Sequence, residues 1–385
     1  HESRKVIDAL LDSLPAMFAG NQAVNSCTGP ALTAAKRMCQ HLGGKLLLFQ
    51  CSLPTMGEGT LKARDNPRLL GTDKEHTLLQ AEESWYKTNA VDLSSKQICV
   101  DCFLFSAHYT DLATIAQLAK ITGGATYYYP GFTQALFGAK YEAELEHCLT
   151  RSTGFESVMR VRATRGLRVS NFYGNYFVRG SDLLALPNCT SDSVFGFDLA
   201  YEDAMLPSTA VTVQAALLYT TSDGERRIRV HTMLIPVTKS VPDFMDSVDI
   251  DCCVNLIAKQ AAEVAVKSGM DQARQRTHQL TVDILRASKQ SQQRGQGFPQ
   301  QPGQQADVPT PASLQLLPLY SMSLQKSLAL RGGTDVRIDE RAFYLQLLSN
   351  MTVDESRVFI YPRMFSIHDM PMDAGIPSDE TEDET

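Results

Sequence analysis

The spacing of apolar residues changes twice along this chain, and the two changes divide it into three regions. Before about residue 130, helical spacing alternates with short apolar runs such as Lys45–Phe49 and Ile98–Phe105, which predicts a parallel sheet covered by helices. Between 155 and 236, short segments of alternating polarity at hairpin spacing predict an antiparallel barrel or sandwich. From Val241 the helical period returns, which predicts a helical domain.

The expected fold class is therefore multidomain, with α/β, all-β and all-α parts in that order. We place the α/β domain at residues 1–140, the barrel or sandwich at 141–240, the helical domain at 241–350, and the start of a further module with an acidic tail at 351–385. Residues 291–311 are rich in Gln, Gly and Pro, which predicts a flexible insertion. A length of 385 residues suits two to three domains.

Composition excludes several classes of protein. Forty-three acidic residues against 36 basic ones give a net charge of -7, which argues against a nucleic-acid binder. We find no apolar run long enough to span a bilayer and no signal peptide at the start, which we interpret as a cut within a domain. Nine scattered cysteines, an odd number, favour a reducing, cytosolic compartment.

The sequence lacks the motifs of common enzymes. There is no phosphate-binding Gly-x-x-x-x-Gly-Lys-Ser/Thr loop, no Gly-x-Ser-x-Gly elbow and no His-Glu-x-x-His helix, so we expect no enzymatic activity. Cys99 and Cys102 form a Cys-x-x-Cys pair, but residues three apart in a strand point to opposite faces, so we interpret them as buried thiols. His41 and His108 are expected in turns, and Trp85 is expected to pack in a helix. We predict no bound metal.

An arginine cluster is the main anomaly in the charge distribution. Six arginines fall within 29 residues that hold one acid, Glu156: Arg151, Arg160, Arg162, Arg165, Arg168 and Arg179. Arg160 and Arg162 are two apart and so share one face of a strand, where two guanidinium groups can bind a pair of carboxylates. The alternative is a solvated strand face neutralised by acids from neighbouring strands. In the second cluster, 226–229, an ordinary amphipathic strand is the preferred interpretation.

Several short motifs, in order along nearly the whole chain, resemble the cargo-adaptor subunit of the inner COPII vesicle coat, the Sec twenty-four family. They are Gly29-Pro-Ala-Leu-Thr-Ala-Ala35, Asp111-Leu-Ala, Tyr127-Tyr-Tyr-Pro130, Leu149-Thr-Arg151, Phe155-Glu-Ser-Val-Met-Arg-Val-Arg162, Phe172-Tyr-Gly-Asn-Tyr-Phe177, Ser181-Asp-Leu-Leu184, Gly224-Glu-Arg-Arg-Ile-Arg-Val-His-Thr232 and Phe365-Ser-Ile-His-Asp-Met370. Each motif alone is weak, whereas their common order is specific.

The resemblance implies the C-terminal part of a von Willebrand A-like trunk at 1–140, a β-barrel, a helical domain and the start of a gelsolin-like module at 351–385. It implies a partner, the Sec twenty-three coat subunit, and contact with the Sar GTPase and the endoplasmic reticulum membrane through the coat. It further implies binding of cytoplasmic sorting signals of cargo and SNARE proteins, and a location in the cytoplasm and on COPII-coated vesicles. Because the zinc-finger cysteines of the family are expected outside this chain, no cofactor is expected here.

The resemblance also implies a site. In the family, acidic sorting signals of the Asp-x-Glu and Leu-x-x-Leu-Glu kind bind arginines of the first barrel segment and a leucine of a later strand, which fall here on Arg160, Arg162 and Leu218. Two alternatives remain at this point. One is the sister coat subunit with GTPase-activating activity, and the other is an A-domain module that binds through a metal ion, although the motif Asp-x-Ser-x-Ser is absent.

Overall fold

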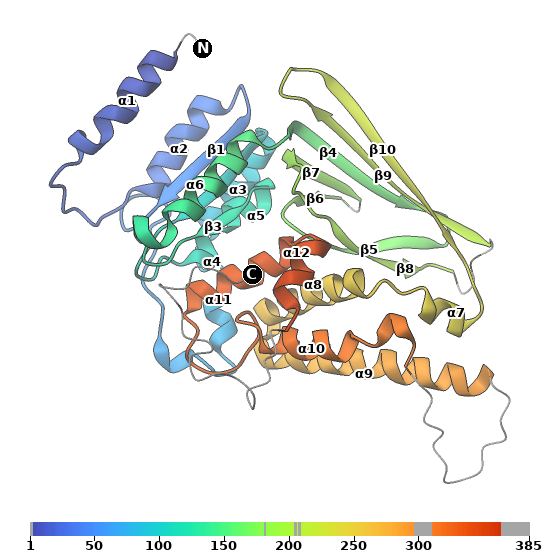
Figure 1. The fold of residues 1–385 in the computed structure, drawn as a ribbon. Helices are drawn as coiled ribbons and strands as arrows, with labels where there is room; N and C mark the ends of the chain where they lie inside the picture. The colour runs from blue at the N-terminus through green and yellow to red at the C-terminus, as the bar shows by residue number, and fades with distance from the viewer. Residues whose placement is uncertain (1–2, 181, 204–205, 207–208, 296–309, 363–385) are drawn as a thin grey trace, which may run out of the picture.

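Three regions follow one another along the chain in the computed structural model, which describes residues 3–180, 182–203, 206, 209–295 and 310–362 (Figure 1). We call them the α/β region (3–150), the β region (153–236) and the helical region (241–360). The expected boundary at residue 140 falls inside helix α6 (Gln134–Thr150), which packs as one helix on the α/β region. The expected acidic tail lies outside the described residues.

The α/β region is built on a parallel sheet, as its alternating pattern predicts. Its strands β1 (Gly44–Gln50), β2 (Ile98–Leu104) and β3 (Thr126–Tyr128) pair in the order β1-β2-β3. The helices are α1 (Arg4–Met17), α2 (Thr28–Cys39), α3 (Ser84–Ser95), α4 (Leu112–Ile115), α5 (Gln117–Thr122) and α6, with short helices η1 (Pro67–Leu69) and η2 (Glu75–Leu79). Parallel strands need such crossover connections.

The two faces of this sheet pack against different cores because successive residues of β2 point in opposite directions. Val100 and Cys102 lie in the main core, whereas Phe103 lies in a second cluster, where its ring contacts Tyr141 of α6. Cys99 is an odd-numbered position like Phe103, so the two thiols point to opposite faces. Both are buried and free, which confirms the interpretation of this pair as strand thiols.

The β region contains two antiparallel sheets, so of the two predicted forms, a barrel or a sandwich, the structure has the sandwich. The strands are β4 (Thr153–Ala163), β5 (Leu167–Tyr173), β6 (Phe177–Arg179), β7 (Leu183–Thr190), β8 (Gly196–Tyr201), β9 (Ala210–Thr220) and β10 (Arg226–Pro236). Five of them form a sheet in the order β10-β9-β4-β7-β6, and β5 pairs with β8. A separate core around Met159, Val161, Leu184 and Leu186 fills the space between the two sheets.

The helical region extends further than predicted at two points. Its helices are α7 (Val241–Asp246), α8 (Ile250–Ser268), α9 (Met270–Gly295), α10 (Leu317–Lys326), α11 (Ile338–Asn350) and α12 (Val353–Ile360), with the short helix η3 (Ala312–Leu314). Residues 291–295 continue α9, because no helix-breaking residue occurs before Gly295, so the insertion does not begin at 291. Residues 296–309 lie outside the described residues. Helix α12 starts at a capping box and packs against α8, so the helical region continues past residue 350.

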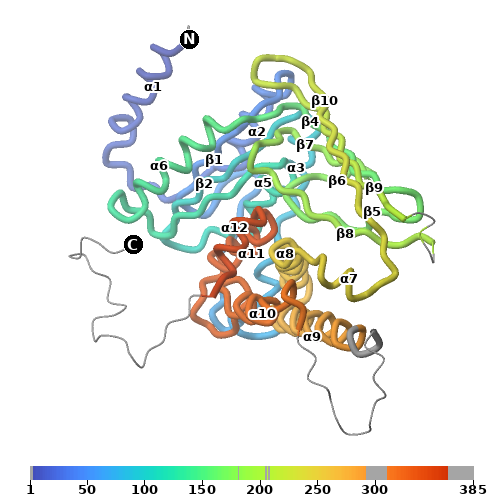
Figure 2. The backbone as a smooth tube through the Cα atoms, turned by 45° about the vertical axis from the view of Figure 1, so that its right-hand side comes forward, coloured from blue at the N-terminus to red at the C-terminus, as the bar shows by residue number. Residues whose placement is uncertain are grey.

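The α/β and helical regions share one core. Ile98, Leu104, Ala258 and Leu345 all belong to the same buried apolar cluster. In Figure 2, α11 and α12 lie between the parallel sheet and α10. The α/β and helical regions therefore form one packed unit, whereas the β region has a core of its own.

A buried ion pair reinforces this junction. The Arg341 Nε and the Glu75 Oε1 are 2.6 Å apart, and the two side chains are 1% and 4% exposed. Arg341 also donates to backbone carbonyl groups at residues 328, 329 and 331. The two charges are thus paired and the Arg341 Nη1 is hydrogen-bonded, whereas the Arg341 Nη2 has no hydrogen-bond partner among the described residues.

Candidate functional site

Strand β4 places the two predicted arginines on its outer face. Met159 and Val161 point into the core of the β region, so the residues that alternate with them point away from it. These are Arg160, which is half-buried, and Arg162, which is exposed. The prediction that both guanidinium groups share one strand face is confirmed.

The strand register brings Leu218 to the same face. On β9, Leu218 lies opposite Val158 and Ala216 lies opposite Arg160. Directly opposite residues of an antiparallel pair point to the same side of the sheet, so Leu218 is a diagonal neighbour of Arg160, at a spacing of roughly 7–8 Å. The three predicted residues therefore form one continuous surface, which we call the outer face.

The two arginines have different surroundings. The Nε of Arg160 lies 3.1 Å from the Oδ2 of Asp182, and the two side chains are 41% and 34% exposed. Among the described residues, no ion pair involves Arg162. The outer face thus offers one guanidinium group that is already paired and one that is exposed to solvent.

Register also adds residues that the sequence analysis did not assign to the site. Leu183 on β7 pairs with Arg160 on β4 and with Arg179 on β6, which places Arg179 in the same row of the outer face. On the other side, Ile228 of β10 pairs with Leu218 and is 70% exposed. The amphipathic strand expected at 226–229 has one apolar side, but only the pairing of β10 with β9 places Ile228 beside the arginines.

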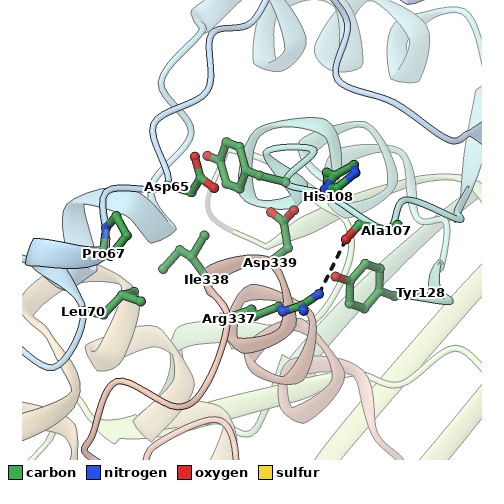
Figure 3. Close-up of a pocket in the computed structure, with 10 residues that line it drawn as sticks. Asp65, Pro67, Leu70, Ala107, His108, Tyr128, Arg337, Ile338 and Asp339 are labelled. Carbon is green, nitrogen blue, oxygen red and sulfur yellow. Dashed lines mark hydrogen bonds between the residues drawn. The ribbon is translucent and has the colours of Figure 1, made fainter. Parts of the chain in front are cut away.

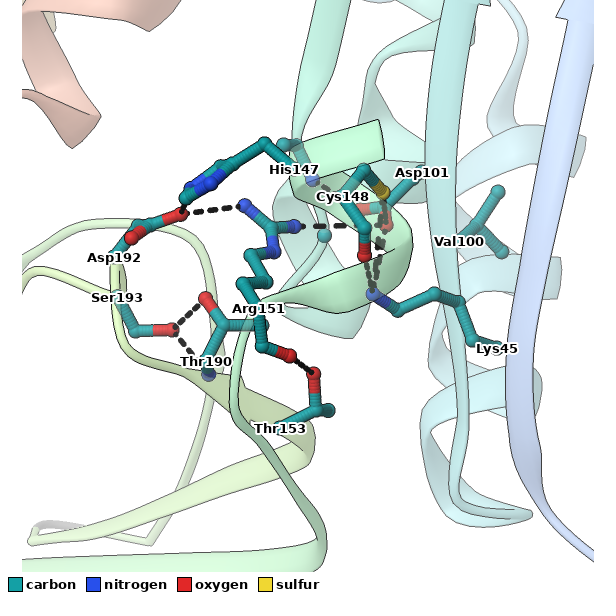
Figure 4. Close-up of polar contacts among 12 residues, drawn as sticks. Lys45, Val100, Asp101, His147, Cys148, Arg151, Thr153, Thr190, Asp192 and Ser193 are labelled. Carbon is teal, nitrogen blue, oxygen red and sulfur yellow. Dashed lines mark hydrogen bonds and ion pairs between the residues drawn. The ribbon is translucent and has the colours of Figure 1, made fainter. Parts of the chain in front are cut away.

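The rest of the arginine cluster is dispersed. Arg151 is 7% exposed and belongs to a polar cluster at the junction of the α/β and β regions (Figure 4), where its guanidinium contacts Asp192 at 3.0 Å and Asp101 at 3.7 Å. Arg168 lies on β5, in the second sheet, and is exposed. Arg151 is a structural residue, because its charge is already neutralised inside the protein.

Asp101 is the centre of that polar cluster. Its fully buried carboxylate accepts hydrogen bonds from the Ala125 N–H at 2.7 Å and the Cys148 thiol at 3.1 Å, and lies 3.4 Å from the Lys45 Nζ. Burial and the nearby Asp101 raise the pKa of Cys148 to about 11, so this thiol stays protonated at neutral pH. The cluster therefore joins the α/β and β regions.

A cavity of about 290 Å³ lies at the carboxyl ends of β2 and β3, where α11 begins (Figure 3). Its wall is mainly apolar, with Leu70, Tyr128 and Ile338, and His108 lies in a bend at its rim. Asp339 also lines it, but its oxygens accept hydrogen bonds from the Thr110 N–H, the Thr110 hydroxyl and the N–H of residue 112. That carboxylate therefore joins two regions of the fold.

The described residues contain no group of three or more His, Cys, Asp and Glu side chains arranged to hold a metal ion. All nine cysteines are free. No helix within the described ranges is long and apolar enough to cross a membrane. Trp85 packs against the main core, as predicted.

Comparison with known proteins agrees with this architecture of an α/β trunk, a β-sandwich and a helical domain. Three family models match: the Sec23/Sec24 trunk domain over residues 1–149, the Sec23/Sec24 beta-sandwich domain over 154–238 and the Sec23/Sec24 helical domain over 249–358. The chain belongs to the Sec23/Sec24 family.

Among its relatives, the protein transport protein SEC24 A of Arabidopsis thaliana is 41% identical over 99% of this chain and 36% of its own length. The protein transport protein SEC24 of Podospora anserina is 40% identical over 99% of this chain and 40% of its own length. The crystal structure of the human COPII-coat protein Sec24c has a TM-score of 0.87 at 31% identity, covering 97% of this chain and 49% of that one. The chain thus spans about two fifths of the length of these curated relatives.

Proposed function

We propose that this chain is part of a cargo-selecting adaptor of the COPII coat, which acts in transport from the endoplasmic reticulum to the Golgi and binds short acidic sorting signals. The observation that carries the proposal is the outer face, where Arg160, Arg162 and Leu218 lie together on two paired strands. The names of the relatives, protein transport protein SEC24 and COPII-coat protein Sec24c, support the transport role.

The spacing of the arginines suits a signal of the Asp-x-Glu kind. In an extended peptide, residues two apart point to the same side and are separated by roughly 6.6 Å. Arg160 and Arg162 have the same separation in sequence on an extended strand. Each carboxylate can therefore meet one guanidinium group in a charge-assisted hydrogen bond, while Leu218 contacts an apolar residue of the signal.

The partners proposed for the complete adaptor follow from the family. They are the Sec twenty-three subunit, the Sar GTPase and the endoplasmic reticulum membrane reached through the coat, and the cytoplasmic signals of cargo and SNARE proteins. We propose a cytoplasmic location, on the cytosolic side of that membrane and on COPII-coated vesicles. The proposed activity is binding, with no enzymatic step, no cofactor held by this chain and no nucleic acid.

Fluorescence anisotropy with labelled peptides tests the proposal. A peptide with an Asp-x-Glu signal should bind the chain, and its Asn-x-Gln counterpart should bind at least tenfold more weakly at low salt, because charge-assisted hydrogen bonds to arginine are lost. Equal affinities would overturn the proposal. A GTP-hydrolysis assay with the Sar GTPase addresses the sister-subunit alternative, which acceleration by this chain alone would favour.

A further inference from the structure

An acidic side chain just before β7, that of Asp182, lies beside the proposed site. Arg179 ends β6 and pairs with Leu183, which begins β7 and also pairs with Arg160. Asp182 immediately precedes this row, and its Oδ2 lies 3.1 Å from the Arg160 Nε. A carboxylate of the protein thus already occupies one side of the guanidinium group that the proposed function assigns to cargo.

We infer that Asp182 is a specificity-determining residue, an internal carboxylate that competes with the sorting signal for Arg160. This inference rests on the proposed function. A signal that carries one carboxylate can use Arg162, which makes no ion pair among the described residues, and so avoids the competition. A signal that carries two carboxylates needs Arg160 as well, so its second carboxylate must share or displace Asp182.

The exposure of the pair makes exchange feasible. Both side chains are more than a third exposed, and ion pairs at such positions are weakly held because water screens them. The buried pair between Arg151 and Asp101 provides the contrast, since their side chains are 7% and 1% exposed and unavailable to a peptide. Two carboxylates at one guanidinium group repel each other, so Asp182 lowers the affinity of Arg160 for any second anion.

This arrangement makes the outer face discriminate between sorting signals that carry one carboxylate and signals that carry two. Removing the charge of Asp182 should strengthen the binding of a two-carboxylate signal and leave a one-carboxylate signal nearly unchanged. Asp182→Asn is the suitable change, because the side chain keeps its shape. Glu225→Gln is the matched control: Glu225 also forms an exposed carboxylate–arginine pair in the β region, with Arg227, but lies at the turn between β9 and β10.

The experiment measures the anisotropy of three labelled peptides, Asp-x-Glu, Asn-x-Glu and Asn-x-Gln, at low and high salt. Wild type, Asp182→Asn, Glu225→Gln, Arg160→Gln and Arg160→Gln/Asp182→Asn are compared, with circular dichroism to establish folding. Asp182→Asn should bind Asp-x-Glu about three- to tenfold more tightly than wild type at low salt, as expected for neutralising one exposed charge beside a site. Asp182→Asn should bind Asn-x-Glu less than about twofold more tightly than wild type, and Glu225→Gln should bind Asp-x-Glu less than about twofold more tightly than wild type. Adding Asp182→Asn to Arg160→Gln should also raise the affinity for Asp-x-Glu less than about twofold.

Each result distinguishes the inference from the proposed function. Binding of Asp-x-Glu by Asp182→Asn but not by wild type would support the inference. Two results would overturn the inference but not the proposed function. One is equal binding of Asp-x-Glu by folded wild type and Asp182→Asn; the other is the same gain in affinity from Asp182→Asn whether or not Arg160 is replaced by Gln. No binding of any acidic peptide by either folded protein would overturn the proposed function, and the inference with it.

Discussion

At the scale of single residues, charge on the outer face should control binding. Arg160 and Arg162 lie two positions apart on β4 and point away from the core, so replacing them should not disturb the packing around Met159. Arg165 and Arg168, which are also exposed, serve as a matched pair outside this row.

Reversing both charges of the site should weaken peptide binding. Arg160→Glu/Arg162→Glu should lower the affinity for Asp-x-Glu at least tenfold at low salt, because like charges then meet, and less at high salt. Arg165→Glu/Arg168→Glu should have a smaller effect. Titrations at two salt concentrations provide the measurement, and equal losses in both variants would contradict the assignment.

Leu218 tests the apolar part of the same face without changing its charge. Leu218→Trp should fill the space beside Arg160 and reduce the binding of a Leu-x-x-Leu-Glu peptide at least tenfold, since the bulky ring occupies the position of the peptide leucine. The measurement is the same titration, with circular dichroism as the folding control. Undiminished binding by the folded variant would place the apolar contact elsewhere.

Thiol reactivity provides an independent check on burial. Cys27, Cys51 and Cys252 are exposed, and three others are buried, at positions 99, 102 and 148. Because burial raises the pKa of the buried thiols and limits access to them, they should react with a disulfide reagent only after unfolding. Denaturing conditions should release all nine thiols. Rapid reaction of more than six thiols in the native protein would contradict the burial of these three cysteines.

At the scale of secondary-structure elements, alternation predicted β4, β9 and β10, but β7 escaped prediction. Pro187 lies inside β7, and proline lacks the N–H that a strand ladder needs. In the structure, β4 pairs with β7 at Asn188 and at Leu186 but not between them, where Glu156 forms a bulge. Pro187 therefore lies where the β4–β7 ladder has no pair to lose. The sequence of either strand alone does not show this match.

The same limit applies to the site. Sequence alternation suffices to place Arg160 and Arg162 on one face, since both belong to one strand. The positions of Leu218 and Arg179 depend on pairing between strands, and the contact of Asp182 with Arg160 depends on the pairing of β4 with the start of β7. Those relations arise only when the sheet is assembled.

The bulge in β4 leads to a stability prediction. Glu156 has φ 49°, a left-handed conformation that costs a residue with a Cβ about 1–2 kcal/mol. Glu156→Gly should therefore unfold with a free energy about 0.5–1 kcal/mol higher than Glu156→Ala, the reverse of the order at an ordinary strand position. Both variants lack the carboxylate near Arg226, so comparing them isolates the backbone effect. Urea unfolding gives the measurement; equal or greater stability of the alanine variant would contradict it.

At the scale of the whole molecule, the junction between the α/β and helical regions should titrate. Burial, opposed by hydrogen bonds from Thr110 and Leu112, raises the pKa of Asp339 to about 6. An unfolded aspartate titrates near pH 3.9, so the folded protein holds the extra proton between about pH 4 and 6. The stability that this proton contributes is complete below that window and is lost as pH rises through it.

Asp339→Asn removes this titration. Relative to the variant, the unfolding free energy of wild type should fall by about 3 kcal/mol between pH 4 and pH 7, which corresponds to the shift of the Asp339 pKa. Denaturant unfolding of both proteins at three pH values measures the difference. A difference that stays constant with pH would show that another group controls this junction.

The shared core also determines when the chain can fold during synthesis. Thr110 and Asp339 are 229 positions apart in sequence, and Glu75 pairs with Arg341 across a similar distance. The ribosome adds residues one at a time, so the parallel sheet leaves it well before the helix that covers its core. Its apolar face remains uncovered during that interval, and contacts of such sequence separation form slowly. The α/β region is therefore completed only after α11, which is synthesised much later, has emerged from the ribosome.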